Sequence, residues 1–407
     1  MVGYLRTGKK EECLGCEACA QICGKNAISI ITDDEKFRYP KVDQKLCVHC
    51  GKCNLVCPVE TPPNRFNEDK YVFGGYCHDE RIRFESTSGG AFSVIADVFC
   101  DKNYVIFGAT ADGLNVYHTK VESVKSIKKI RKSKYSQSRI FDSYNEVKKY
   151  LSEGKKVLFS GTPCQIAALS NYLRGSNIDN LLTVEVVCEG VPSPLYVEKY
   201  KSYLEKNKKA SLSEFDYRYK GKAIFGKGKW DFQIQRVILN TERGEKILKK
   251  DRWVNPFWSI WLQHLMSRPS CYQCPFTNAK RVADISLGDL WGIHIFCPEL
   301  YGENGGTSLV IANSSKGKKY VKLAQKFMYG HCIRFEDAIK YQGPLRKSID
   351  MNTSREEFMK DLKSDMTYED INRKWSKKPT IKLLIQKYIY GNRQKIFIWK
   401  NFKRKRG

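Results

Sequence analysis

The sequence predicts an α+β protein in two main parts, a small cysteine-rich domain followed by a larger mixed α/β domain. Two observations carry this prediction. Residues 1–62 contain a tandem repeat of closely spaced cysteines, and from about residue 70 short apolar strands alternate with amphipathic helices. The run TPPN at 61–64 is typical of a linker between the two parts.

Length and composition limit the classes of function that this chain can have. With 407 residues and 42% hydrophobic content, the chain can form two or three packed domains. No run of about 18 apolar residues occurs and no apolar stretch precedes a cleavage site, so we expect neither a membrane-spanning helix nor a secretory leader. In the cytoplasm expected here, 16 cysteines favour metal binding over disulfides. The net charge of +27 indicates an anionic partner.

The cysteine repeat has the spacing of iron–sulfur ligands. The run C-x2-C-x2-C-x3-C occurs at 13–23 and again at 47–57. In such runs three cysteines hold one cluster and the fourth crosses to the other. Zinc is the alternative, but it prefers separated C-x-x-C pairs over two complete runs of this kind. The sequence predicts two 4Fe–4S clusters, the first held by Cys13, Cys16, Cys19 and Cys57, the second by Cys47, Cys50, Cys53 and Cys23.

Further motifs follow in the second part. STSGGA at 86–91 and SGTPCQ at 160–165 each lead into an expected helix, and CEGVPSP at 188–194 follows an expected strand. CYQC at 271–274 precedes RVADISLGDLWG at 281–292. Together these motifs resemble the beta subunit family of coenzyme F-420 hydrogenase/dehydrogenase, over about residues 1–345.

The resemblance implies a bacterial-ferredoxin-like domain followed by a mixed α/β flavin-binding domain at 70–345, in which FAD exchanges electrons with iron–sulfur clusters. Glycines at a helix start offer backbone N–H groups to a pyrophosphate, although ordinary helix capping by Ser88 is the alternative. Asp284 and Asp289 are candidates for orienting a ring nitrogen or a ribose, or are turn residues. The predicted flavin contacts are Ser88, Gly89, Gly90, Gly161, Thr162, Arg281 and Asp289.

Four further cysteines match the number that one more cluster needs. Cys164 and Cys188 each follow an expected strand at one edge of the sheet, and Cys271 and Cys274 form a C-x-x-C pair. We hypothesise that these four hold a third 4Fe–4S cluster. The alternative is two buried thiols beside an unrelated C-x-x-C pair. The scattered Cys77, Cys100, Cys297 and Cys332 are expected to be inert buried thiols.

Residues 346–407 are expected to form a helical, basic C-terminal tail. Its last part, 377–407, holds 11 Lys or Arg residues interleaved with apolar ones and no Asp or Glu. Such a segment suits contact with an anionic membrane surface, which would place the protein at the inner face of the membrane. A plain basic tail and a final helix packed on the core are the alternatives.

These features predict an iron–sulfur flavoprotein oxidoreductase that passes electrons between ferredoxin-type clusters and a small organic substrate through FAD. We expect a ferredoxin-like electron donor or acceptor protein as partner. The alternative is a non-catalytic electron-transfer subunit of a larger redox complex. No nucleic-acid-binding module is recognisable and the basic excess is concentrated at one end, so no nucleic-acid partner is expected.

Overall fold

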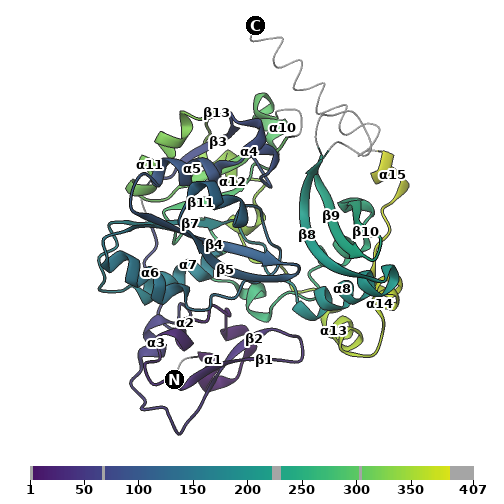
Figure 1. The fold of residues 1–407 in the computed structure, drawn as a ribbon, viewed down its shortest axis with the longest axis horizontal. Coiled ribbons are helices and arrows are strands. Elements are labelled where there is room, and N and C mark those ends of the chain that lie inside the picture. Colours follow the sequence, from purple (N-terminus) through teal and green to yellow (C-terminus); the bar gives the residue numbers. More distant parts are fainter. Residues whose placement is uncertain (1–2, 67–68, 222–230, 302–304, 386–407) are drawn as a thin grey trace.

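The computed structural model describes residues 3–66, 69–221, 231–301 and 305–385, and it has three parts (Figure 1). A small cysteine-rich N-terminal domain lies against a central body built on an eight-stranded sheet, and a three-stranded sheet forms a second lobe beside that body. This arrangement confirms the predicted mixed α/β class with a small domain in front. Among the described residues, no helix has the length and apolar character to cross a bilayer.

The central sheet has the strand order β13-β3-β12-β11-β7-β6-β4-β5. Its middle strands β4, β6, β7 and β11 run parallel, so their carboxyl ends meet at one edge of the sheet. Ligands of open α/β sheets bind at that edge. The strands are β3 (Tyr71–Cys77), β4 (Tyr104–Asp112), β5 (Asn115–Val121), β6 (Lys156–Gly161), β7 (Leu181–Val186), β11 (Ile285–Asp289), β12 (Ser308–Ala312) and β13 (Met328–Cys332).

Helices cover both faces of this sheet, as its apolar middle strands require. On one face, α5 (Ala91–Phe99) and α11 (Ser315–Gln325) pack together over an apolar core. On the other face, α6 (Ser143–Ser152) and α7 (Pro163–Tyr172) enclose a second core. The shorter helices of this body are α4 (Glu80–Phe84), η2 (Val124–Lys129), η4 (Pro269–Gln273), α10 (Ile293–Phe296), η5 (Pro298–Leu300), α12 (Phe335–Ile339) and η7 (Gly343–Leu345).

The second lobe is an antiparallel sheet with helices packed on it. Its strands are β8 (Ala210–Gly221), β9 (Asp231–Thr241) and β10 (Gly244–Asp251), with β9 in the centre. Its helices are α8 (Pro194–Lys208), η3 (Arg252–Val254), α9 (Pro256–Trp261), α13 (Arg355–Lys363) and α14 (Tyr368–Trp375).

The region expected to be a C-terminal tail is partly folded into this lobe. Phe358 and Leu362 of α13 and Ile371 of α14 are fully buried in the aromatic core that also holds Trp258. Apolar residues at helical spacing drive this packing, because each buried side chain of this size contributes about 1.5–3 kcal/mol. The short helix α15 (Ile381–Leu384) follows, and the rest of the predicted membrane-binding segment, 386–407, lies outside the described residues.

The N-terminal domain docks on the α6 and α7 side of the central body (Figure 1). It contains α1 (Gly3–Thr7), η1 (Lys10–Glu12), α2 (Ala18–Gln21), the hairpin β1 (Ile28–Thr32) and β2 (Arg38–Val42), and α3 (Lys52–Val56). Leu14, Ala18 and Val56 enter the same core as α6 and α7. The two parts therefore share one apolar core across their interface.

Candidate functional site

The first predicted ligand set comes together in the N-terminal domain. Cys13, Cys16, Cys19 and Cys57 line one small cavity, with the fourth cysteine contributed by the second run. Burial raises the pKa of the Cys16 thiol well above its ordinary value, and the negative charges of Cys57 and Cys19 raise it further. Four thiols that oppose one another's ionisation in this way suit a site where metal ions compensate the charge. That they hold a cluster stays a prediction.

The second predicted set lies nearer the surface. Cys53 lies in α3 and its pKa is raised by burial, with Cys47 and Cys50 adding to the effect through their charges. Cys50 is exposed and Cys47 is partly buried. Cys23 follows α2, which packs on α3, and its sulfur accepts a hydrogen bond from the backbone N–H of Ala27 at 3.3 Å. That these four cysteines hold a cluster also stays a prediction.

The third cysteine set converges on a larger cavity in the central body. Cys164 is the second residue of α7, which follows β6, and Cys188 follows the neighbouring parallel strand β7, so both lie at the carboxyl edge of the sheet. Cys271 and Cys274 reach the same place from η4. All four line a cavity of about 250 Å³. The sequence segments that supply these thiols are thus brought together as the third-cluster hypothesis requires.

The electrostatics of this third set resemble those of the first. Burial raises the pKa of Cys188 well above its ordinary value, and the charges of Cys271 and Cys164 add to this. Burial likewise raises the pKa of Cys271 to about 12 and that of Cys274 to about 11. Without a compensating cation these buried thiols would stay protonated at neutral pH. The donor set therefore fits a metal cluster, which would supply that cation.

One buried arginine lies between the first and third cysteine sets. Arg268, 1% exposed, donates to the Cys13 carbonyl at 2.9 Å and to the Cys13 sulfur at 3.5 Å, and its side chain lines the 250 Å³ cavity. Gln137 accepts a further hydrogen bond from it at 3.2 Å. Burial opposes the charge of Arg268, but the negative charges of Cys13, Tyr39 and Cys271 outweigh that effect and raise its pKa. Arg268 thus links two ligand sets by hydrogen bonding and by charge.

Two further cavities continue from the third set along the carboxyl edge of the sheet. One, of about 430 Å³, shares Cys188, Gly190 and Thr162 with the cysteine cavity. The other, of about 180 Å³, adjoins it at Tyr135 and Arg218 and ends against the first turn of α5. Cofactor sites commonly have volumes of about 300–1,000 Å³. The position and size of these cavities suit a dinucleotide with its pyrophosphate near α5.

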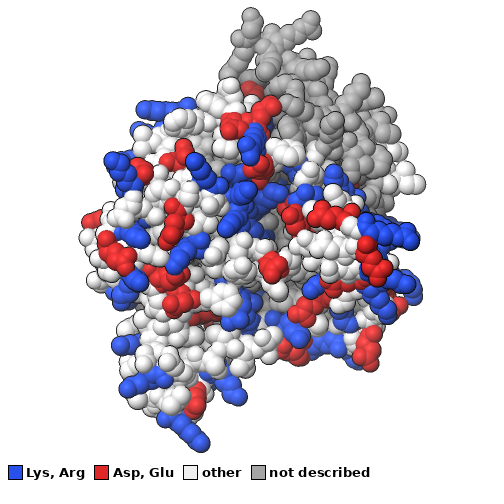
Figure 2. Space-filling model, in the orientation of Figure 1, with Lys and Arg blue, Asp and Glu red and all other residues white. Residues whose placement is uncertain are grey.

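Basic side chains dominate the charged lining of these two cavities. Lys and Arg side chains also gather on the visible surface where the central body meets the second lobe (Figure 2). Arg218 is 5% exposed and pairs with Asp289 at 2.5 Å. A pyrophosphate would meet a net positive environment here. The basic residues that line the two cavities are Arg131, Lys132, Lys134, Arg218 and Arg252.

Three of the predicted flavin contacts line the smaller of these two cavities. Ser88, Gly90 and Asp289 line the 180 Å³ cavity. Gly90 precedes α5 with φ of +91°, a left-handed conformation that favours glycine. Gly89 is packed against β3, because a Cβ there would lie 2.5 Å from the carbonyl oxygen of Gly75, and its contact with a flavin stays a prediction.

The other three predicted contacts are placed differently. Thr162 faces the junction of the cysteine cavity with the 430 Å³ cavity, and its hydroxyl lies 3.1 Å from the Cys164 sulfur. Gly161 precedes the capping box that Thr162 forms with Gln165, so this turn is organised as a helix start. Arg281 is buried beside Glu185 and donates to the Phe276 carbonyl, and it lines neither the 180 Å³ nor the 430 Å³ cavity. The structure therefore gives the flavin prediction for Arg281 no support.

Most of the basic residues that line the 250 Å³ and 430 Å³ cavities could not be predicted from the sequence. Lys134, Arg218, Arg252 and Arg268 stand in no motif, and only their burial in the folded chain marks them. The weak signal for Arg268 was its place three residues before Cys271.

One scattered cysteine also departs from expectation: Cys77, Cys100 and Cys297 are buried, but Cys332 is exposed at the end of the edge strand β13.

Comparison with known proteins agrees with this architecture. Residues 154–336 match the C-terminal region of the family described as coenzyme F420 hydrogenase/dehydrogenase, beta subunit, and residues 12–61 match the 4Fe-4S dicluster domain. The first of these segments contains the third cysteine set and part of the cavity lining, and the second contains both ferredoxin-type runs.

Relatives in the N-terminal region carry ferredoxin names. An uncharacterised polyferredoxin-like protein of Methanocaldococcus jannaschii is 39% identical over 62 residues, 13% of this chain and 37% of that protein. The chain thus spans little more than a third of that relative. Ferredoxin-3 of Rhodobacter capsulatus is 27% identical over 77 residues, 14% of this chain and 76% of that protein.

One solved structure, of the F420-reducing NiFe hydrogenase complex from Methanosarcina barkeri, is similar at a TM-score of 0.43 and 16% identity, covering 77% of this chain and 91% of that chain. The two family matches, by contrast, are to defined domains at the places where the cysteine sets lie. Residues 154–336 of the chain are thus similar to the C-terminal region of the coenzyme F420 hydrogenase/dehydrogenase beta subunit family, and the chain carries a 4Fe–4S dicluster domain at its N-terminus.

Proposed function

We propose that this chain is an iron–sulfur flavoprotein oxidoreductase that passes electrons between its N-terminal clusters and a small organic substrate by way of FAD. The observation that carries the proposal is the continuity of the sites. Leu14 lines both the first cysteine cavity and the third, and Cys188 lines both the third cavity and the 430 Å³ cavity beyond it. FAD, when bound, supplies the conversion between two-electron and one-electron chemistry.

The chain's own residues have three tasks in this proposal. The first turn of α5 would receive the pyrophosphate, because a helix start presents unpaired N–H groups and a positive dipole end. Arg218, held at 2.5 Å from Asp289 and 3.0 Å from the Tyr135 hydroxyl, would fix one wall of the cavity. The burial of the third cysteine set would keep water away from the contact between the cluster and the cofactor.

The experiment that tests the proposal measures flavin. We expect the anaerobically purified and reconstituted protein to retain about one FAD per chain after gel filtration, and to reduce the deazaflavin coenzyme or another conjugated acceptor with reduced ferredoxin. Arg218→Met should lose most of the FAD, because the cavity loses a buried cation. Arg236→Met is the matched control, since Arg236 sits nearby on β9 but pairs with Asp216 and Glu214 outside the cavity lining.

Two results would contradict this function. A reconstituted wild-type protein that holds no FAD removes the flavoprotein proposal. A protein that holds FAD but turns over no acceptor with an artificial electron donor favours the alternative, a non-catalytic electron-transfer subunit.

A pH dependence of flavin binding follows from Lys134. Burial lowers the pKa of Lys134 to about 7, with Lys132 adding to the effect and Asp216 opposing it. Lys134 lines the 430 Å³ cavity, which adjoins the proposed pyrophosphate site, and the negative charge of bound FAD would favour its protonated amine. The pKa of Lys134 would then rise in the complex, and binding would take up a proton above pH 7. The affinity for FAD should therefore fall by up to about tenfold per pH unit between pH 7 and 9. Ultrafiltration or fluorescence titration of FAD from pH 6 to 9 measures this.

Lys134→Met isolates that effect. The variant should bind FAD weakly at pH 6 and lose most of the slope, because it has no amine to protonate. Lys149→Met on the exposed face of α6 should keep the wild-type pH profile. An unchanged slope in Lys134→Met would assign the pH dependence to another group.

A further inference from the structure

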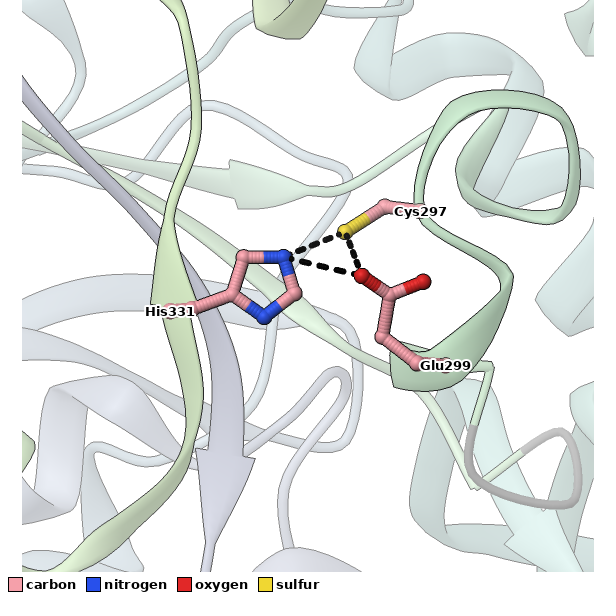
Figure 3. A group of neighbouring side chains, drawn as sticks. All are labelled: Cys297, Glu299 and His331. Atoms are coloured by element: carbon pink, nitrogen blue, oxygen red, sulfur yellow. Dashed lines mark hydrogen bonds and ion pairs between the residues drawn. The ribbon is translucent and has the colours of Figure 1, made fainter. Parts of the chain in front are cut away.

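Three side chains outside the electron-transfer sites converge on one point. Cys297 precedes η5, Glu299 lies within it, and His331 projects from the edge strand β13 (Figure 3). The Cys297 sulfur lies 3.0 Å from His331 Nε2 and 3.6 Å from Glu299 Oε1, and Nε2 lies 3.1 Å from Oε1. None of the three lines the two cysteine cavities or the 180 Å³ and 430 Å³ cavities described above.

The arrangement differs from a hydrogen-bonded catalytic relay. In a nucleophile–imidazole–carboxylate relay, the nucleophile and the carboxylate contact opposite nitrogens of the ring. Here the sulfur and the carboxylate oxygen both face the same nitrogen, Nε2 (Figure 3). One ring nitrogen carries one proton or one lone pair, so it cannot serve both neighbours well. A shared cation between the three atoms resolves that conflict.

The spacing also fits a tetrahedral metal. Zinc bonds of about 2.0–2.3 Å to nitrogen, oxygen and sulfur place neighbouring ligand atoms about 3.3–3.6 Å apart. The observed separations of 3.0, 3.1 and 3.6 Å differ from these values by about half an ångström or less. The other carboxylate oxygen of Glu299 is buried and has no hydrogen-bond partner within the described part of the chain. A positive ion would compensate this carboxylate.

We propose that Cys297, Glu299 and His331 form a mononuclear zinc site, separate from the iron–sulfur ligands. A thiolate, a carboxylate and an imidazole are all zinc ligands, and three protein ligands leave a fourth position for water. Cys297 is 2% exposed, whereas the His331 side chain is 43% exposed, so the metal is anchored in the core and reachable from solvent.

A metal ion at this site would connect the segment around Cys297, which packs on the lining of the 430 Å³ cavity, to the edge strand β13. Phe296, next to Cys297, stacks on Tyr341 with ring centroids 6.0 Å apart, and Tyr341 lines that cavity. His331 lies 34 residues after Cys297 in the chain, on β13, which is an edge strand of the sheet. A zinc ion would thus cross-link two segments that are far apart in sequence.

Zinc analysis of the intact chain tests the proposal. Anaerobically purified, chelator-washed protein is incubated with one equivalent of ZnCl2, gel-filtered, and analysed for zinc and iron and by zinc K-edge absorption. We expect about one zinc per chain with one sulfur neighbour at about 2.3 Å and nitrogen or oxygen neighbours at about 2.0 Å. Zinc misplaced in a cysteine cluster site would instead show a shell of sulfur atoms alone.

Variants of the ligands provide the second test. Cys297→Ser and His331→Gln should weaken zinc binding by about 100-fold or more, because loss of even an outer partner costs about 10–100-fold. Their iron content should stay at the wild-type value, which also shows that the chain folds. Cys332→Ser, which changes the adjacent exposed thiol, should retain zinc. Wild-type protein that takes up no zinc, an all-sulfur shell, or undiminished zinc in His331→Gln would each overturn the proposal.

Discussion

Replacing Cys188 with serine should lower the iron content from about twelve to about eight atoms per chain, because one of three 4Fe–4S clusters is lost. Cys188 lines the 250 Å³ cavity together with Cys164, Cys271 and Cys274, and burial raises its pKa well above the ordinary value. Four buried thiols of this kind are stable as thiolates only with metal bound. Iron and sulfide quantitation on the anaerobically reconstituted protein measures the change.

The same variant should also interrupt electron flow. Cys188 lies where the cysteine cavity meets the 430 Å³ cavity, so a cluster there would stand between the ferredoxin domain and the flavin. Reduction of bound FAD by reduced ferredoxin should therefore be lost, while the two N-terminal clusters keep their spectra. Cys100→Ser is the matched control, because Cys100 is a buried thiol of a separate apolar core. Wild-type protein with only about eight iron atoms would reject the third cluster.

The parts of this site that could be predicted from the sequence are those whose ligands are close along the chain. The two cysteine runs carry their spacing in the sequence itself, and the C-x-x-C pair at 271–274 does the same. Cys164 and Cys188 could be placed at one sheet edge because each follows an apolar strand, and β6 and β7 are indeed parallel neighbours. For these cysteines, the local sequence pattern was sufficient to predict which residues come together.

The remaining features depend on contacts that no local pattern encodes. Cys297 and His331 meet only because β13 returns antiparallel to β3 at the sheet edge. The close approach of the Gly75 carbonyl to Gly89, which leaves no room for a Cβ, is likewise not visible in the glycine motif itself. Arg281 stood in a family motif, but its partner Glu185 is 96 residues away on β7. In each case a partner distant in sequence decides the role.

Arg268 is the second residue whose replacement should have a large effect, and its effect is on reduction potential. Its hydrogen bonds within the described chain go to carbonyls, an amide oxygen and the Cys13 sulfur, with no carboxylate among them. Its positive charge is therefore available to stabilise electrons on clusters at either side. Arg268→Gln should lower the potential of the cluster beside Cys13 by on the order of 100 mV, as expected for a buried charge a few ångströms away.

A neighbouring arginine supplies the control for this prediction. Arg38 also lines the first cysteine cavity, but it pairs with Glu17 at 2.8 Å, so its charge is already offset. Arg38→Gln should change the potential much less than Arg268→Gln, as measured by redox titration followed by electron paramagnetic resonance. Arg268→Lys should restore part of the shift, since it keeps the charge but not the forked hydrogen bonding. Equal shifts in Arg268→Gln and Arg268→Lys would show that hydrogen bonding, rather than charge, sets the potential.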